Sequence, residues 1–365
     1  MNYNSYRRKT REVRLGNMSI GATSPVSIQS MTNTDTHDFD ATYRQVSELC
    51  EAGCEIVRIA VPDIGASEVF SYLRAKGVGI PLVADIHFDY KIAIASVESG
   101  VSKIRINPGN IGERRNVESV VNACKGSGIP IRIGVNSGSV ERSILEKYGA
   151  PTAEALAESA LYHASILEEL DFKNTVISVK ASDVQTMLRA NRILAERTDY
   201  PLHLGVTEAG ARTRAIVKSS IGIGALLSEG IGDTVRVSLT DSPLEEIGAA
   251  KRILDTLDIR EEKGMDIVSC PTCGRTRIDL ISITEEFERR AAREGLDRYG
   301  IKVALMGCAV NGPGEAREAD IGIAGGDGVG LIFKKGEIVK KVKERCLVDE
   351  LISEIRLMVK DSIKI

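Results

Sequence analysis

The sequence lacks long hydrophobic runs and a strong excess of either charge. No stretch approaches the ~18 consecutive apolar residues that a membrane-spanning helix needs, which argues against a membrane protein. Residues 1–11 are polar and basic without an apolar core, so we expect no secretory signal there. The chain holds 48 Lys and Arg against 51 Asp and Glu, a net charge of −3. This balance gives no general attraction to nucleic acid or to an anionic membrane, and we expect neither as a partner.

Cysteine is also scarce, with seven in 365 residues. That number is too small for a disulfide-stapled fold, and an odd count favours free thiols together with a metal site. We therefore expect a reducing compartment, the cytoplasm. The hydrophobic fraction of 43% excludes wholesale disorder, and the length suggests about two domains.

Short β-branched runs alternate with helix-like segments from about residue 25 to residue 258. The eight candidate strands cover residues 26–31, 55–61, 81–87, 103–107, 130–136, 175–180, 201–206 and 233–239. Eight strand–helix units in ~230 residues predict an α/β fold, a (β/α)₈ barrel of the TIM type. An open doubly wound sheet is the alternative, although no Gly-x-Gly-x-x-Gly follows the first strand.

Polar and apolar side chains alternate within five of these strands. Lys103, Arg105 and Asn107, for example, share one face of their strand. The face that packs on the helices of a barrel must be apolar, so the polar face points into the lumen, which normally holds branched apolar side chains. The inward cations are then Arg58, Lys103, Arg105, Arg132, Lys180 and Arg236.

Six cations held close together repel one another unless an anion neutralises them. An Arg guanidinium group can donate two parallel hydrogen bonds to two oxygens of one phosphate. A phosphate or diphosphate ester is therefore the expected ligand. Internal ion pairs with Asp85 and Glu208, or wrongly phased strands, are the alternative.

Further polar residues stand where strands end, the position of catalytic residues in such barrels. Asp85 and His87 end one strand, and Glu208 follows the seventh. A carboxylate beside cations can act as an acid or base or bind a substrate hydroxyl, but Glu208 is equally suited to the start of the next helix. His87 and His203 can be purely structural.

A charged stretch at residues 260–264 interrupts the barrel pattern, so we expect domains at residues 1–260 and 261–365. The second is long enough for a small α+β domain. Its expected strands cover residues 266–269, 302–306 and 320–323. Its expected helices cover residues 283–294 and a segment near the C-terminus.

Three cysteines of the second domain have the spacing of metal ligands. Cys270 and Cys273 form a Cys-x-x-Cys pair, and Cys308 begins a glycine-rich segment after a strand. Three interpretations of these cysteines remain possible from their spacing. They are a [4Fe–4S] cluster with three cysteines, a zinc site completed by Cys346, and a redox-active dithiol. Glu315 is the other candidate for a fourth ligand.

The motifs resemble those of the hydroxymethylbutenyl diphosphate synthase family, also called IspG or GcpE. The two cysteine motifs, CPTCGRT at 270–276 and MGCAVNGPGEA at 306–316, carry most of the resemblance. The barrel motifs are SMTNTDT at 30–36, RIAVP at 58–62, ADIHF at 84–88, RINPGN at 105–110, RIGVNSG at 132–138 and GVTEAG at 205–210. The resemblance runs from near residue 7 to past residue 330.

The resemblance implies a definite reaction. The family reductively opens 2-C-methyl-D-erythritol 2,4-cyclodiphosphate to 4-hydroxy-3-methylbut-2-enyl diphosphate in non-mevalonate isoprenoid biosynthesis. It implies a [4Fe–4S] cluster on Cys270, Cys273, Cys308 and Glu315, with Glu315 displaced by substrate, and Glu208 as the acid or base. A flavodoxin or ferredoxin would donate electrons, and a homodimer would bring the two domains together. We expect the substrate-binding residues to be Arg58, Asp85, His87, Arg105, Asn107, Arg132, Asn136, Lys180, Arg236 and Ser238.

Two other functions compete with this interpretation. A phosphate-binding barrel with a structural zinc tail would need no redox chemistry. A cluster-containing dehydratase of another phosphorylated polyol would need no external electrons.

Overall fold

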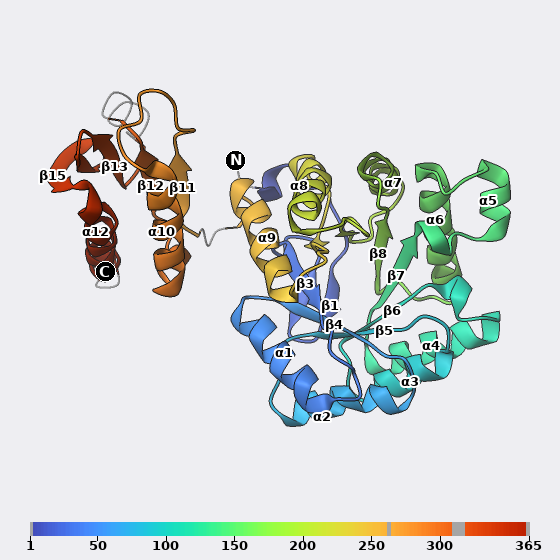
Figure 1. Ribbon diagram of the computed structural model, residues 1–365. Coiled ribbons are helices and arrows are strands. Elements are labelled where there is room, and N and C mark those ends of the chain that lie inside the picture. The colour runs from blue at the N-terminus through green and yellow to red at the C-terminus, as the bar shows by residue number, and fades with distance from the viewer. Residues whose placement is uncertain (1–2, 261–263, 309–317, 363–365) are drawn as a thin grey trace. The chain divides into compact units, whose positions relative to one another are not determined.

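The computed structural model describes residues 3–260, 264–308 and 318–362. The chain divides into two compact units, Met1–Arg260 and Glu261–Ile365. Each unit is described by itself (Figure 1).

The first unit is a parallel β-barrel, which confirms the predicted fold class. Its strands are β3 (Ser27–Met31), β4 (Ile56–Ala60), β5 (Leu82–Asp85), β6 (Lys103–Ile106), β7 (Ile131–Asn136), β8 (Thr175–Lys180), β9 (His203–Leu204) and β10 (Thr234–Val235). They pair in parallel in the order β8-β7-β6-β5-β4-β3-β10-β9, and a bridge between Ile177 and Leu202 joins the two ends. The closed ring excludes the open doubly wound sheet.

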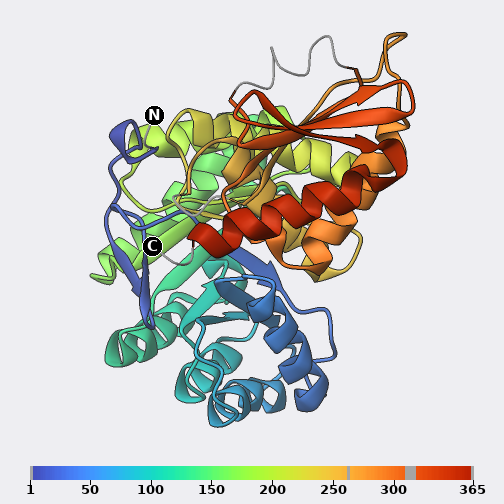
Figure 2. The same ribbon diagram turned by 90° about the vertical axis from the view of Figure 1, so that its left-hand side faces the viewer.

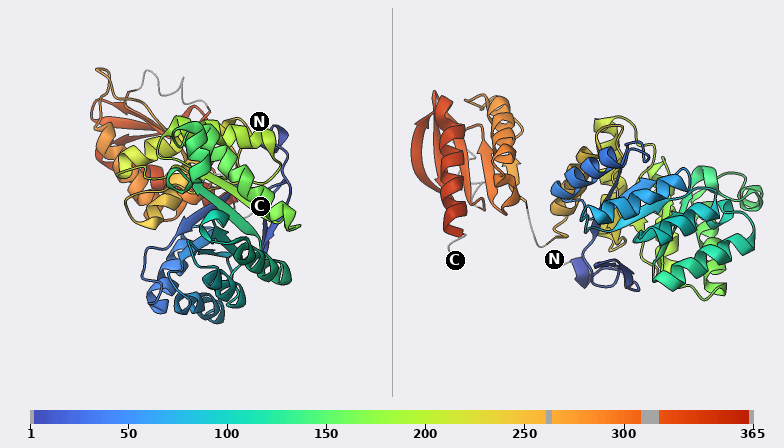
Figure 3. Two further views of the ribbon diagram at one scale, coloured as in Figure 1. Left: turned by 90° about the vertical axis from the view of Figure 1, so that its right-hand side faces the viewer. Right: turned by 90° about the horizontal axis from the view of Figure 1, so that it is seen from below.

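Helices surround the barrel, as Figures 1 and 3 show. They are α1 (Phe39–Glu51), α2 (Val69–Ala75), α3 (Tyr90–Glu98), α4 (Arg114–Ser127), α5 (Arg142–Tyr148), α6 (Ala153–Glu169), α7 (Val184–Arg197), α8 (Arg212–Ser228) and α9 (Pro243–Thr256). Local sequence sets several helix starts: the side chains of Asp38, Thr152 and Asp183 each accept a hydrogen bond from a backbone N–H of the first turn. The outward-facing strand residues, Ile104 and Ile133 among them, lie in the core beneath the helices. The predicted phase of the strands is therefore correct.

A hairpin that the sequence did not predict contacts the amino-terminal ends of the strands. It consists of β1 (Val13–Leu15) and β2 (Met18–Ile20). Its Leu15 and Ile20 pack with Ile56 and Val83, which stand at or near the start of β4 and β5. The hairpin thus covers the lumen at the end opposite the carboxyl ends of the strands.

The second unit is a five-stranded sheet with two helices on one face (Figure 2). Its strands, in sheet order, are β11 (Asp266–Ser269), β12 (Lys302–Met306), β13 (Ile321–Gly326), β14 (Val329–Lys334) and β15 (Glu337–Lys343). The helices are α10 (Leu280–Arg293) and α12 (Leu347–Ser362), and both contribute to one apolar core. The first three strands are parallel.

The sequence missed β14 and β15 of this sheet. They follow β13 as antiparallel neighbours through tight turns in which Gly328 and Gly336 have positive φ. All but one residue of β15 are exposed, so the strand carries no alternating apolar pattern that would reveal it. Among the residues that the structure describes, no helix is long and apolar enough to cross a membrane.

Candidate active site

A cavity opens at the carboxyl ends of the barrel strands, where barrel enzymes carry their active sites. It is lined by Arg58, Asp85, His87, Arg105, Arg132, Gly134, Asn136, Ser178, Lys180, Thr207, Arg236 and Ser238. Its volume is about 120 Å³, whereas pockets for drug-sized ligands enclose roughly 300–1,000 Å³. The space suits a small, highly charged group.

The cavity is strongly cationic because several strands each contribute one positive side chain. Arg58 comes from β4, Arg105 from β6, Arg132 from β7 and Lys180 from β8, and Arg236 directly follows β10. Arg132, Arg105 and Lys180 are buried. The five predicted cations of the lining therefore converge as the alternation pattern indicated.

Asp85 is the carboxylate of the cavity wall, and it contacts three of the basic residues. Arg105 donates a hydrogen bond from Nη1 to Oδ1 over 3.1 Å, and Arg58 Nε lies 3.7 Å from Oδ2. His87 Nε2 lies 3.6 Å from the same oxygen, with its ring half exposed at the mouth. Burial alone would raise the pKa of Asp85, but Arg58, His87 and Arg105 hold it well below its usual range. Asp85 is therefore ionised at neutral pH.

A second buried carboxylate, Glu246 of α9, was missed by the sequence analysis. Its two oxygens accept hydrogen bonds from Nε and Nη2 of Arg236, both at 3.1 Å. Ser30 and the backbone N–H of Leu239 also donate to it. A signal did exist in the sequence: Glu246 stands beside Ile247 on the otherwise apolar face of an amphipathic helix. The expected internal partner Glu208 is instead exposed.

The lumen holds more positive charge than its carboxylates balance. Six cations share it with Asp85, while Glu246 reaches only Arg236, from the surrounding helix α9. Lys103 Nζ and Arg132 Nε and Nη2 have no hydrogen-bond partner among the described residues. Burial first, and then repulsion from Arg236 and Arg132, lowers the pKa of Lys180 well below its usual value. Unpaired buried donors of this kind are costly unless a ligand satisfies them, and an anion does so.

Two glycines keep space open for these cations. A Cβ on Gly134 would lie 2.3 Å from Arg105 Nε, and one on Gly205 would lie 2.7 Å from Lys180 Nζ. Gly134 is an inward residue of β7 and Gly205 directly follows β9, so a larger residue at either position would displace a cation of the cavity. The sequence showed Gly134 on the polar face but gave it no role.

Two predicted site residues stand apart from the cavity lining. Asn107 is buried, but its amide donates to Ser139 O at 3.1 Å and accepts from Gly109 N at 3.0 Å, so it shapes the loop after β6. Glu208 is exposed, with φ near 50°, immediately after the lining residue Thr207. Ser178, Thr207 and Gly134 line the cavity although the sequence analysis did not select them.

Three cysteines of the second unit lie in the loops that follow two neighbouring strands of its sheet. Cys270 directly follows β11, and Cys308 follows the neighbouring parallel strand β12 by two residues. Gly307 N donates to Cys270 Sγ over 3.2 Å, and Cys273 N donates to Thr276 Oγ1 over 3.0 Å. Arg277 N also bonds to Gly307 O, which ties the loop of Cys273 to that of Cys308. All three thiols are free.

These thiols suit an iron–sulfur cluster in their chemistry. Cluster sulfur atoms are thiolate-ligated and accept backbone N–H hydrogen bonds, and the Gly307 N–H already points at a cysteine sulfur. Hydrogen bonds from the backbone and side chain of Arg275 lower the pKa of Cys273, which favours its thiolate form. Glu315 lies outside the described residues. In the described part of the chain, no three His, Cys, Asp or Glu side chains are arranged to hold a single metal ion.

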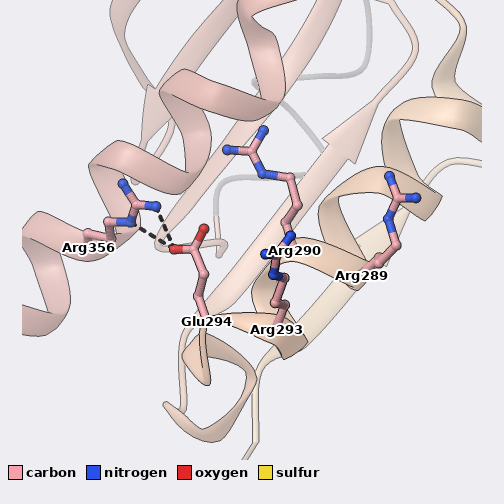
Figure 4. A pocket seen from close by; sticks show the side chains of 5 residues that line it. All are labelled: Arg289, Arg290, Arg293, Glu294 and Arg356. Atoms are coloured by element: carbon pink, nitrogen blue, oxygen red, sulfur yellow. Dashed lines mark hydrogen bonds and ion pairs between the residues drawn. The ribbon is translucent and has the colours of Figure 1, made fainter.

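A second depression lies on the surface of the second unit (Figure 4). It is lined by Arg289, Arg290, Arg293, Glu294 and Arg356. Arg356 pairs with Glu294, and Arg290 pairs with Asp349. Exposed ion pairs of this type are a solvated surface, and we assign no site here.

Fold and cavity together define an α/β-barrel protein with a cationic cavity at the carboxyl ends of its strands. Comparison with family models identifies which one: the GcpE TIM-barrel domain matches residues 10–251, and the GcpE protein C-terminal domain matches residues 266–357. The chain belongs to the GcpE family.

Curated relatives span nearly the whole chain. A protein of Clostridium perfringens is 60% identical over 96% of this chain and 99% of its own length. One of Geobacillus thermodenitrificans is 56% identical over 96% of this chain and 92% of its own length. Both are named 4-hydroxy-3-methylbut-2-en-1-yl diphosphate synthase (flavodoxin).

Solved structures resemble the barrel in fold alone. The type I 3-dehydroquinate dehydratase of Clostridium difficile aligns with a TM-score of 0.51 and 16% identity, covering 68% of this chain and 98% of that one. The dihydropteroate synthase of Stenotrophomonas maltophilia aligns with a TM-score of 0.50 and 13% identity, covering 69% and 100%.

Proposed function

We propose that this protein is a 4-hydroxy-3-methylbut-2-en-1-yl diphosphate synthase that takes its electrons from a flavodoxin. The observation that carries the proposal is the under-neutralised cationic cavity, found in a chain 60% identical to a protein of that name. The substrate is 2-C-methyl-D-erythritol 2,4-cyclodiphosphate. Two electrons enter, one carbon–oxygen bond to the diphosphate breaks, and a hydroxyl leaves as water.

The barrel binds and orients the diphosphate. Arg132 and Lys180 have no carboxylate partner among the described residues, so they are the cations most available to phosphate oxygens. Arg58, Arg105 and Arg236 are already oriented by Asp85 and Glu246, which fixes their guanidinium planes before the substrate arrives. Asn136 and Ser238 add neutral hydrogen-bonding groups to the same wall.

Cys270, Cys273 and Cys308 would hold a [4Fe–4S] cluster, with Glu315 as the fourth ligand. Bound there, the cluster would supply electrons one at a time at low potential. The proposal for Glu315 rests on the family resemblance, because that residue lies outside the described part of the chain.

We assign Glu208 to proton delivery for the departing hydroxyl. It follows the seventh barrel strand, β9, by four residues, has a left-handed backbone, and stands next to Thr207 of the cavity wall. Glu208→Gln is expected to lower kcat far more than it raises KM, because the loss concerns chemistry rather than binding. A change in KM alone would make Glu208 a binding residue instead.

The enzyme would act as a cytoplasmic homodimer. Seven free thiols suit a reducing compartment. In a homodimer, the cluster unit of one chain can serve the barrel of its partner.

Metal analysis of protein purified without oxygen tests the proposal. The wild type is expected to be brown, with about four iron and four sulfide per chain. Cys308→Ser is expected to lose the colour and the iron, whereas Cys50→Ser on α1 is expected to retain both. Colourless protein with one zinc per chain would instead favour a phosphate-binding barrel with a structural zinc tail. A brown protein that dehydrates a phosphorylated polyol without added electrons would favour the other alternative.

A further inference from the structure

Lys103 lies in the barrel lumen but does not line the cavity. It is the first residue of β6, two positions before Arg105 on the same face, and it is fully buried. It pairs in register with Val83, which packs against the β1–β2 hairpin. Lys103 therefore lies between the hairpin at the amino-terminal ends of the strands and the cationic cavity at their carboxyl ends, and its Nζ has no hydrogen-bond partner among the described residues.

The charged groups around Lys103 are mostly positive. Arg58 on β4 and Arg132 on β7 repel it, and its charge helps to lower the pKa of His203 on β9. The nearby carboxylates are engaged elsewhere, since Asp85 contacts Arg58, Arg105 and His87, and Glu246 of α9 contacts Arg236. Lys180 on β8 is repelled by the same Arg132 and Arg58.

An unpaired lysine in this position can relieve the repulsion by losing its proton. Arginine guanidinium groups do not deprotonate in proteins, whereas lysine does so readily when it is buried. Burial, followed by repulsion from Arg132 and Arg58, lowers the pKa of Lys103 well below its ordinary value. His203 is also buried with a lowered pKa and is neutral, so it provides no counter-charge.

We propose that Lys103 is a positioning residue of the anion site that is neutral in the vacant barrel and takes up a proton when a diphosphate binds. This inference rests on the proposed function, because it requires a diphosphate in the cavity. The bound negative charges would offset the repulsion from Arg58 and Arg132, so the ammonium form of Lys103 becomes favourable and attracts the diphosphate. The proton comes from solvent.

The coupling has a defined sign. At a pH below the pKa of Lys103 in the vacant barrel, the amine is already charged and binding needs no proton. Above that pKa each binding event takes up a proton, so the affinity falls as the pH rises, by up to about tenfold per pH unit for one proton. Lys103→Met removes this part of the pH dependence.

Titration calorimetry of the cyclic diphosphate tests the proposal on oxidised, cluster-loaded protein without reductant, so that no turnover occurs. Each phosphate of this ligand carries one ester bond and one anhydride bond, so it has no proton that titrates near neutral pH. Measurements at pH 8 to 9 in buffers of different ionisation enthalpy therefore count protons taken up by the protein. The wild type is expected to take up more protons than Lys103→Met, by as much as one. Lys173→Met, at an exposed lysine, is the matched control and is expected to behave as the wild type.

Two further measurements separate positioning from a structural role. Lys103→Met is expected to keep or raise the Tm of the vacant protein, because it removes an unpaired amine from among like charges. Lys180→Met is expected to weaken binding but still to show proton uptake. If Lys103→Met does not fold, this variant decides the question: uptake that persists supports Lys103, and uptake that disappears overturns it.

The remaining outcomes are also decisive. Diphosphate binding without proton uptake in the wild type, or equal uptake in the wild type and Lys103→Met, would overturn the role of Lys103 and leave the proposed function intact. A wild type that does not bind the cyclic diphosphate at all would overturn both.

Discussion

At the residue scale, Asp85 and Glu246 divide the cations of the lumen into two groups. Arg58, Arg105 and Arg236 each contact one of these carboxylates, whereas Lys103, Arg132 and Lys180 have no ion pair among the described residues. The first group is part of the folded structure even without a ligand. The second group is destabilising in the vacant barrel, and we expect it to be retained for binding.

This division predicts different effects for two arginine substitutions. Arg105→Ala is expected to weaken binding of the cyclic diphosphate and also to destabilise the fold, because it deprives Asp85 of a partner. Arg132→Met is expected to weaken binding by roughly 1.5–3 kcal/mol without loss of stability. Calorimetry and urea unfolding measure the two quantities, with the exposed Arg293→Ala as control. Equal affinity in Arg132→Met and the wild type would remove Arg132 from the binding site.

Asp85 predicts a pH-dependent contribution to stability. Its pKa is held low in the folded state, so its contribution is full above the unfolded-state pKa of about 3.9 and is lost as the pH falls below that value. Asp85→Asn is expected to cost about 3–5 kcal/mol of unfolding free energy at pH 7. The difference from the wild type should shrink in acid unfolding series below about pH 4.

The exposed Asp199→Asn is the control for this series, with a cost of ~1 kcal/mol or less at every pH. A cost of Asp85→Asn that stays constant down to pH 2 would contradict the assignment of the ion pairs.

At the scale of elements, each barrel strand has an apolar face that packs against the helices and a polar face that points into the lumen. Their outward residues are apolar and pack under the helices, while their inward residues include long cations. Arg105 and Lys180 fit because Gly134 and Gly205 beside them carry no side chain. The β1–β2 hairpin covers the other end of the lumen, so the carboxyl ends of the strands offer the approach to the cations.

Filling one of these two glycine positions tests this arrangement. Gly134→Ala is expected to push Arg105 from its contact with Asp85 and to weaken diphosphate binding at least tenfold, since about 1.4 kcal/mol suffices for that change. Gly126→Ala, on α4, has open space around its Cβ and is the matched control, with unchanged binding and slightly higher stability. Unchanged affinity in Gly134→Ala would show that the position of Arg105 does not matter.

At the scale of the whole molecule, the cationic cavity and the cysteines of the proposed cluster belong to different compact units. The proposed reaction needs both at one substrate. A homodimer meets this need if the barrel of one chain works with the cysteines of the other.

Mixing two defective variants at low substrate concentration tests this arrangement. Arg132→Met leaves the barrel site mostly empty at that concentration, and Cys308→Ser disables the cluster site. After subunit exchange, the mixture is expected to regain about one quarter of wild-type activity, because half of the dimers would contain one intact pair of sites. Activity that stays absent after proven exchange would show that each chain uses its own cysteines.

The sequence by itself determined the repeating and local features. Period-two alternation reveals both the strand and its polar face, so the barrel and five cations of its cavity could be predicted. The spacing of Cys270, Cys273 and Cys308 likewise follows directly from the chain. The N-terminal hairpin and β15 were missed, because short or exposed strands carry too few apolar residues to form a pattern.

Only the tertiary structure decided which of these residues are partners. Ser30 and Glu246 stand 216 positions apart, and barrel closure brings them to 2.8 Å. Asn107 shares the polar face of Arg105 in the sequence. In the structure it shapes a loop, because its amide donates a hydrogen bond to the Ser139 carbonyl. Lys103 and Arg105 look alike in the sequence, but only Arg105 meets a carboxylate. An alternation pattern specifies the face of a strand, whereas charge balance depends on every strand that meets around the lumen.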